Sequence, residues 1–170
     1  MVAAAEPLLR QFASSNEVSV NLATEVEGEM RYHACCRSPA RLSVNLQVGS
    51  AVPVARTAIG RAFYAASSPA RQSVILSNLQ QHLSTEDYKH AQLALSDAAE
   101  HYRLHGYTVS DGEFSTDILA VAVGVFDIAT GQHAYSLNAS VPSANWQADE
   151  YAATIVPKLQ ALAEKIGRGI

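Results

Sequence analysis

Apolar and polar positions alternate along three stretches near the start of the chain, at residues 18–26, 30–36 and 41–48. Alternation with a period of two places one set of side chains on one face, which is typical of a half-buried β-strand. A turn at residues 27–29 separates the first two stretches. The pattern predicts three antiparallel strands in a row, of which the first two form a hairpin.

The middle of the chain has the spacing of helices. Residues 56–66 predict a first helix with Thr57 as its N-cap, after a loop stiffened by Pro53. Ser68-Pro69 precedes a second helix, and Ser84 begins a third that ends at Gly106.

The last part of the chain predicts three more strands. A short strand at 107–111 is followed by residues 118–126, which are apolar at every position, as expected for a central strand covered on both faces. A third strand at 132–140 follows a turn with Gly131 at its end.

Helices are expected at both ends of the chain. Residues 4–15 predict a short helix, and a longer one is expected from about Asn145 to Ile166, where Pro157 predicts a kink or a second helix. Strands and helices thus occur in separate blocks, so we expect an α+β fold with an antiparallel sheet of about six strands. Residues 1–170 are expected to form a single domain.

Composition narrows the classes of function. The chain has a net charge of −4 and its 12 Lys and Arg residues are scattered, which argues against binding nucleic acid by itself. Cys35 and Cys36 point to opposite faces of a strand and cannot bridge each other, which favours a reducing compartment. No signal peptide is evident, and the longest apolar run, residues 118–126, is about half a membrane span. We therefore expect a soluble cytoplasmic protein, or part of one, with no membrane contact.

The sequence contains no specific catalytic motif. A nucleophile elbow, a phosphate-binding Gly-Lys-Ser loop, a Gly-x-Gly-x-x-Gly motif and a metal-spaced Cys/His cluster are all missing. His101 and His105 have zinc-ligand spacing, but a third ligand is not evident, so a solvated polar face is the better interpretation. Asp111 and Glu113 are similarly interpreted as turn-capping, solvated carboxylates. We expect neither an enzyme nor a cofactor.

A binding site is easier to predict. The helix start at Thr57 exposes backbone N–H groups at the positive end of the helix dipole, where a carboxylate or phosphate binds well. Asn138 and Ser140 share one face of the strand 132–140, because they are two residues apart. They either point to solvent or line a cavity beside that helix start, where a small organic acid would satisfy both sets of groups.

Several motifs together resemble one protein family. The run from Val48 to Ala62 resembles the valine-glycine, proline, threonine-alanine and glycine-lysine-alanine pattern of IclR-type transcriptional regulators. Further matches follow in the same order as in that family: His105-Gly-Tyr107, Asp111, Glu113, Phe126-Asp127, Gly131, Ser140-Val-Pro142 and Ile155-Val-Pro157. The resemblance covers about residues 4–168 and implies the C-terminal effector-binding domain, a GAF-like fold around a curved antiparallel sheet.

The resemblance also implies where an effector binds. In such a domain the backbone around Thr57, Ala58 and Ile59 accepts a small carboxylate or aromatic acid. The residues that close the pocket in this sequence are Ser110 or Asp111, Ala120, Asn138 and Ser140. Arg56 is unusual at its position; it either pairs directly with an anionic effector or lies only at the rim of the pocket. Asn138, Ala120 and Arg61 stand where relatives have serine, cysteine and lysine, so the effector's identity cannot be copied from them.

The implied partners are a second copy of the chain, as a homodimer or homotetramer, and DNA through a winged helix-turn-helix that is absent from this sequence. Either the sequence was cut at the linker helix or the natural protein lacks DNA binding. Two alternatives remain at this stage. One is a module used only for dimerisation or tetramerisation, and the other is a GAF-type sensor from another signalling architecture, such as a kinase.

Overall fold

One antiparallel sheet lies at the centre of the protein, in the computed structural model, which describes residues 2–38 and 46–169. Its six strands have the order β3-β2-β1-β6-β5-β4. The strands are β1 (Ser19–Val26), β2 (Glu29–Cys36), β3 (Ala51–Pro53), β4 (Thr108–Asp111), β5 (Ile118–Asp127) and β6 (Gln132–Pro142). The helices are α1 (Val2–Asn16), α2 (Ala58–Ala66), α3 (Pro69–His82), α4 (Thr85–His105), the 3-10 helix η1 (Ser143–Asn145) and α5 (Ala148–Gly167).

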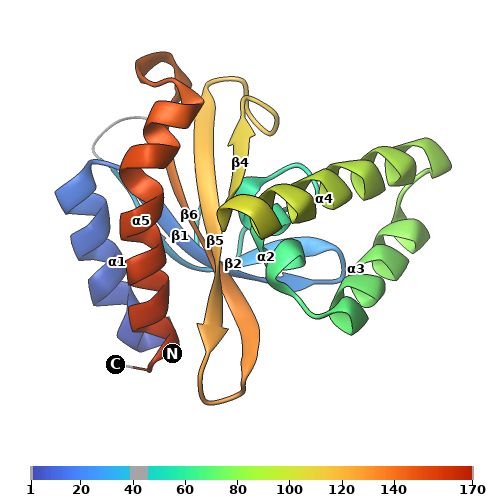
Figure 1. Ribbon diagram of the computed structural model, residues 1–170, viewed down its shortest axis with the longest axis horizontal. Helices are drawn as coiled ribbons and strands as arrows, with labels where there is room; N and C mark the ends of the chain where they lie inside the picture. The colour runs from blue at the N-terminus through green and yellow to red at the C-terminus, as the bar shows by residue number, and fades with distance from the viewer. Residues whose placement is uncertain (1, 39–45, 170) are drawn as a thin grey trace.

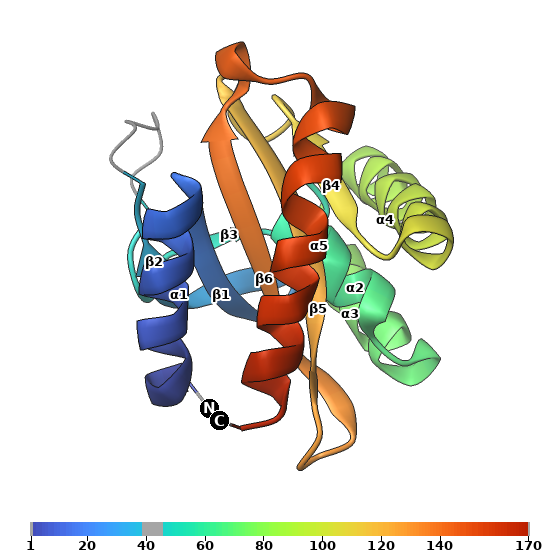
Figure 2. The ribbon, with the colours of Figure 1, turned by 60° about the vertical axis from the view of Figure 1, so that its left-hand side comes forward.

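Helices cover the two faces of the curved sheet differently (Figures 1 and 2). Helices α1 and α5 lie side by side on one face, where they bury an apolar cluster with alternate residues of β1, β5 and β6. Helix α2 lies on the other face, with α4 packed against it and α3 farther out. Central strand β5 contributes Leu119 and Val121 to the first cluster and Ala120 and Ala122 to the second, so it is buried on both sides, as its unbroken apolar run predicts.

Two helices begin at the predicted capping residues. The side chains of Thr57 and Ser84 accept hydrogen bonds from backbone N–H groups in the first turns of α2 and α4, and Ser68 caps α3 in the same way. Gly106 ends α4 in the left-handed conformation, with φ of 78°. The predicted α+β class and the curved six-stranded antiparallel sheet are confirmed.

Two local predictions need correction. The predicted strand 41–48 falls partly outside the described residues, and its remaining residues 46–48 are not in a strand. The third strand of this region is instead Ala51–Pro53, which pairs with β2. Residues 148–167 form one helix with Pro157 inside it, rather than two joined helices, and this helix begins three residues later than expected.

A buried carboxylate holds the hairpin between β1 and β2. The Glu25 side chain is fully buried, with an exposed fraction of 0%, and its Oε1 accepts a hydrogen bond of 2.6 Å from the N–H of Gly28 in the turn. Its Oε2 pairs with Arg71 Nη2 of α3 at 2.5 Å. The ion pair therefore connects the sheet to a helix more than forty residues later in the chain.

None of the helices in the described residues combines the length and apolar character needed to cross a bilayer.

Candidate functional site

The loop between β3 and α2 runs closely along the start of α2. A Cβ atom at Gly60 would lie 2.2 Å from the carbonyl oxygen of Val54 and 2.5 Å from its Cα. Only glycine allows this approach of two backbones. The glycine in the Val48–Ala62 motif thus fixes where the first turn of α2 lies against the loop.

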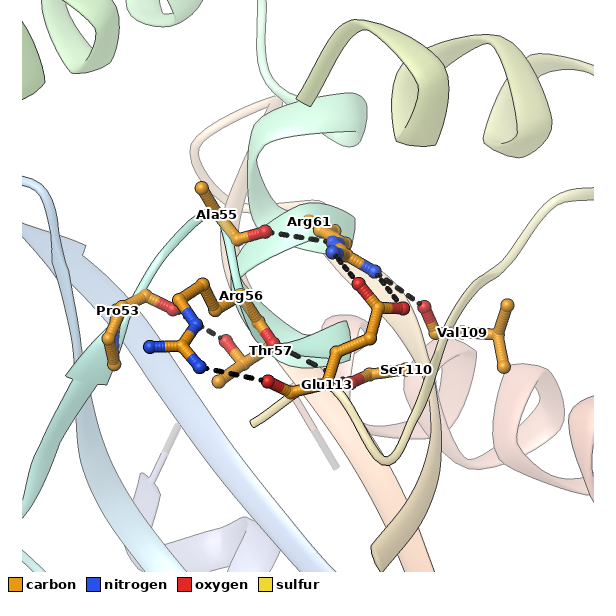
Figure 3. Close-up of polar contacts among 8 residues, drawn as sticks. All are labelled: Pro53, Ala55, Arg56, Thr57, Arg61, Val109, Ser110 and Glu113. Carbon is orange, nitrogen blue, oxygen red and sulfur yellow. Dashed lines mark hydrogen bonds and ion pairs between the residues drawn. The ribbon is translucent and has the colours of Figure 1, made fainter. Parts of the chain in front are cut away.

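Thr57 organises this turn with its hydroxyl group (Figure 3). The Oγ1 atom donates to the carbonyl oxygen of Pro53 at 2.8 Å and accepts from the N–H of Gly60 at 3.2 Å. The N–H groups of Ala58 and Ile59 have no acceptor within the helix, because they belong to its first turn. Thr57 therefore has a structural role, and the donors at this helix start are backbone groups.

The first turn of α2 is also attached to the sheet. The Ala58 carbonyl oxygen accepts from Thr108 Oγ1 of β4 at 2.7 Å, and the Ile59 carbonyl oxygen accepts from Ser136 Oγ of β6 at 2.8 Å. Both hydroxyl groups are buried. These two bonds fix the distance of the helix start from the polar residues that follow on β6.

Arg61 and Glu113 form an ion pair between α2 and the loop after β4 (Figure 3). Arg61 Nη1 donates to Glu113 Oε1 at 2.9 Å, and Nη2 contacts Oε2. The same guanidinium donates to the carbonyl oxygens of Ala55 and Val109, at 2.9 Å and 3.1 Å. Hydrogen bonds from Arg61 lower the pKa of the Glu113 carboxyl, against the opposing effect of partial burial. The charge of this arginine is therefore compensated within the protein.

Arg56 lies beside the same loop but is bound differently. Its Nη2 donates to the backbone carbonyl oxygen of Glu113 at 3.1 Å, and the side chain is exposed. In the described part of the chain no carboxylate lies in ion-pair contact with it. Arg56 thus keeps a positive charge at the rim of the α2 start.

Polar side chains form two rows across the face of the sheet that α2 covers. The first row places Asn21 of β1 opposite Asn138 of β6, and the second places Ser19 opposite Ser140. Each of these four side chains belongs to a residue only 6% exposed. Asn21 Nδ2 donates to Asn138 Oδ1 at 2.9 Å, and Asn138 Nδ2 lies 3.5 Å from Ser140 Oγ.

The second row extends to the edge of the sheet. Ala120 of β5 lies opposite both Ser140 and Ser110, so these three predicted residues share one face. The Ser110 hydroxyl group lies 3.5 Å from the carbonyl oxygen of Arg56. Asp111 instead lies opposite Leu119, on the face covered by α5, and it is exposed. The structure therefore gathers Ser110, Ala120, Asn138 and Ser140, and places Asp111 on the other side of the sheet.

Two polar residues of these rows, Ser19 and Asn21, were not predicted. They occupy the alternate positions to Val18, Val20 and Leu22, whose pattern predicts the strand but does not tell what covers its polar face. The Arg61–Glu113 pair was also not predicted, because its partners are 52 residues apart and Glu113 was expected to be solvated.

Other candidate groups form separate arrangements. The rings of His101 and His105 lie 4.5 Å apart, and His101 also contacts the Tyr107 ring edge-on. No group of three or more His, Cys, Asp and Glu side chains that could hold a metal occurs among residues 2–38 and 46–169. Cys35 and Cys36 are both free thiols, and burial raises the pKa of Cys35 to about 11.

The chain was compared with known proteins. The family model for the C-terminal part of the bacterial transcriptional regulator IclR matches residues 1–168. The Pca regulon regulatory protein of Pseudomonas putida is 28% identical over 137 residues, which span 80% of this chain and 47% of that protein. The chain thus spans about half the length of this curated relative.

Solved structures have the same fold. An IclR family transcriptional regulator from Brucella abortus superposes with a TM-score of 0.85 at 24% identity, over 100% of this chain and 64% of that one. The inducer-binding domain of a PobR double mutant from Acinetobacter, in complex with 3-hydroxybenzoic acid, gives 0.78 at 16% identity, over 100% and 99% of the two chains. On the family match, the chain belongs to the IclR family of bacterial transcriptional regulators and corresponds to their C-terminal, effector-binding domain.

Proposed function

We propose that this chain senses a small organic acid, and that binding changes the geometry of a dimer or tetramer whose DNA-binding domains lie outside this sequence. The observation that carries the proposal is the set of four buried polar residues, Ser19, Asn21, Asn138 and Ser140, on the sheet face beside the start of α2. These side chains are partly paired: Ser19 Oγ accepts from the N–H of Ser38 at 3.1 Å, and Asn21 is bonded to Asn138. The capacity that remains on the two asparagines favours a polar ligand.

The charges beside this set favour an acid. Arg61 is neutralised by Glu113, whereas Arg56 donates only to a backbone carbonyl and keeps its charge. The first turn of α2 adds the N–H groups of Ala58 and Ile59 and the positive end of the helix dipole. A carboxylate at this point would meet two sources of positive potential. The negative charge of the nearby Glu113 is compensated by Arg61.

The opposite end of the ligand would contact the sheet. Ser110, Ala120 and Ser140 lie in one cross-strand row, and all three side chains are small. Phe114 and Leu46 pack against the apolar cluster on the α2 face, which includes Ala120, and would supply apolar contacts. Such a combination suits a compact acid with an apolar body, in line with the 3-hydroxybenzoic acid named for the PobR domain.

Regulation requires that the ligand bind two arrangements of the protein with different affinity. The proposed carboxylate position is at the start of α2, and α2 packs directly against α4. A shift of the first turn of α2 would therefore pass to α4 and change the surface that α3 and α4 present. We propose this route for coupling to the assembly.

Thermal unfolding with a panel of small aliphatic and aromatic carboxylates tests the acid. An acid present at a hundred times its dissociation constant adds about 2.7 kcal/mol to the free energy of unfolding. We expect some acids to raise the melting temperature and their methyl esters to have no effect. The N138A/S140A double variant is expected to lose the response, whereas the exposed-site control Asn145→Ala keeps it.

If no acid stabilises the wild-type chain, and the double variant behaves like wild type, the acid-sensing proposal is wrong. Sedimentation across concentration would then show whether the domain serves only in assembly.

A further inference from the structure

We infer that Asn21 determines effector specificity, and that the effector carries a hydroxyl group in addition to its carboxylate. The inference rests on the proposed function, because it assigns the second polar contact of the same ligand. It starts from the two facing amides, Asn21 and Asn138, in the middle of the sheet.

The amide pair has more hydrogen-bonding groups than it uses. Each asparagine side chain offers one carbonyl oxygen and one NH₂ group. The bond from Asn21 Nδ2 to Asn138 Oδ1, at 2.9 Å, uses one donor and one acceptor. The Oδ1 of Asn21 and the Nδ2 of Asn138 remain on the same face. Within the described part of the chain, Asn138 Nδ2 makes only a long 3.5 Å contact to Ser140 Oγ.

The neighbours on this face do not complete the pairing. Cys35 lies opposite Asn21 on the next strand, and Ala122 lies opposite Asn138. Neither a thiol nor a methyl group is a good hydrogen-bonding partner. Among residues 2–38 and 46–169, the row therefore leaves an acceptor next to a donor, on two residues that are each 6% exposed.

A hydroxyl group matches this arrangement because it donates and accepts at once. Its hydrogen atom would bind Asn21 Oδ1 while its oxygen accepts from Asn138 Nδ2. A second carboxylate would accept from Asn138 but place negative charge against the Asn21 carbonyl oxygen. A ligand with a methyl group or a hydrogen atom at this position would leave Asn21 Oδ1 and Asn138 Nδ2 without partners. Leaving buried polar groups unpaired lowers affinity by more than a hydrogen bond raises it.

The position of the pair fits a ligand whose acid group is at α2. Asn138 is two residues from Ser136, which holds the first turn of α2 through the Ile59 carbonyl oxygen. At about 3.4 Å per residue, the two side chains are about 7 Å apart along the strand. One small molecule can therefore contact the backbone at Ile59 with its carboxylate and the amide pair with its hydroxyl.

Calorimetric titration with matched acids tests the inference. Benzoate is compared with 3- and 4-hydroxybenzoate, and butyrate with its hydroxylated derivatives, on wild type and on Asn21→Ala. We expect wild type to bind at least one hydroxylated acid about tenfold more tightly than its parent, the size of one well-placed hydrogen bond pair. In Asn21→Ala this ratio is expected to fall to about one.

Two further variants separate specificity from structure. Asn21→Ser keeps a hydroxyl group at the position and is expected to recover part of the preference, and Asn145→Ala is expected to behave as wild type. A preference that is the same in wild type and Asn21→Ala, or no preference in wild type, overturns the inference while leaving acid binding intact. Failure of every acid to bind wild type overturns the proposed function, and this inference with it.

Discussion

Adjacent residues of β6 lie in two different environments. Leu137 is completely buried among α1, α5 and the apolar residues of β1 and β5. Asn138, one position later, faces the α2 side, where it meets Asn21 and Ser140. The same alternation runs along β1, so β1 and β6 direct apolar side chains to the α1/α5 face and polar side chains to the α2 face, and both sets are buried.

We interpret the apolar α1/α5 face as the main source of stability and the polar residues on the α2 face as the recognition site. Apolar burial on the α1/α5 face contributes directly to folding, since its side chains have no hydrogen bonds to lose. Burying four polar side chains on the other face is unfavourable unless they are paired. We propose that they are retained at the centre of the sheet for ligand binding, so substitutions on the two faces are expected to have different consequences.

The largest effect is expected for Leu137→Ala. Removing this side chain leaves a cavity in the apolar cluster and lowers the free energy of unfolding by about 3 kcal/mol. The matched change Asn138→Ala, next in sequence, is expected to lower it by only about 1 kcal/mol, because it removes one short hydrogen bond and one long contact. Urea unfolding of both variants measures this. Equal losses would mean that the polar rows are a structural core, contrary to our interpretation.

A smaller loss of stability is expected for Gly60→Ala, although this substitution usually stabilises a helix. Alanine normally stabilises a helix by about 1 kcal/mol relative to glycine. Here its Cβ would overlap the Val54 carbonyl oxygen, so we expect a loss of about 2 kcal/mol and weaker acid binding. Chemical unfolding and calorimetry check the two parts. A gain in stability would show that the loop moves away freely and does not fix the α2 start.

Glu113→Gln is expected to lower the free energy of unfolding by about 1 kcal/mol at pH 7, a value reduced by the 48% exposure of the carboxylate. Because folding lowers the pKa of Glu113, its contribution is complete above the ordinary value of 4.5 and is lost as the pH falls through the lowered value. The difference between wild type and variant is therefore expected to shrink in acid.

The exposed Arg103–Glu100 pair on α4 provides the control for this prediction. It has the same residue types, and both side chains are more than half exposed. Glu100→Gln is expected to leave unfolding unchanged. If the two glutamine variants behave alike in urea at pH 7, the Arg61–Glu113 pair does not hold the loop.

The smallest effect is expected on the apolar face, for Tyr151→Phe. The Tyr151 hydroxyl group is buried and has no hydrogen-bond partner among the described residues. Its removal is expected to raise the free energy of unfolding by up to about 1 kcal/mol, because an unpaired buried hydroxyl is unfavourable. Thermal unfolding measures the change, and a clear loss of stability would show that the Tyr151 hydroxyl group contributes to folding, contrary to our interpretation.

Local patterns in the sequence predicted most of the elements but not what covers them. Alternation identified β1 and β2, and capping residues such as Thr57 and Ser84 marked the helix starts. Strand β3, at Ala51–Pro53, is too short to have a detectable period. The burial of Asn21 depends on β6 and α2, which follow far later in the chain, so no local pattern could reveal it.

The family resemblance supplied information of another kind. It placed the start of α2 and the β6 positions Asn138 and Ser140 in one site, where spacing alone left both solvent and cavity possible. It did not supply Asn21 or the Arg61–Glu113 pair, which depend on side chains of this sequence meeting across the fold.

Amide chemical-shift mapping during titration with a small aromatic acid tests the central claim most directly. We predict saturable shifts of the side-chain NH₂ signals of Asn21 and Asn138 and of the backbone amides of Ala58 and Ile59, with the signals of α1 and α5 unchanged. Shifts confined to α1 and α5, or no saturable shift with any acid that stabilises the protein, would contradict the assignment of the polar face as the effector site.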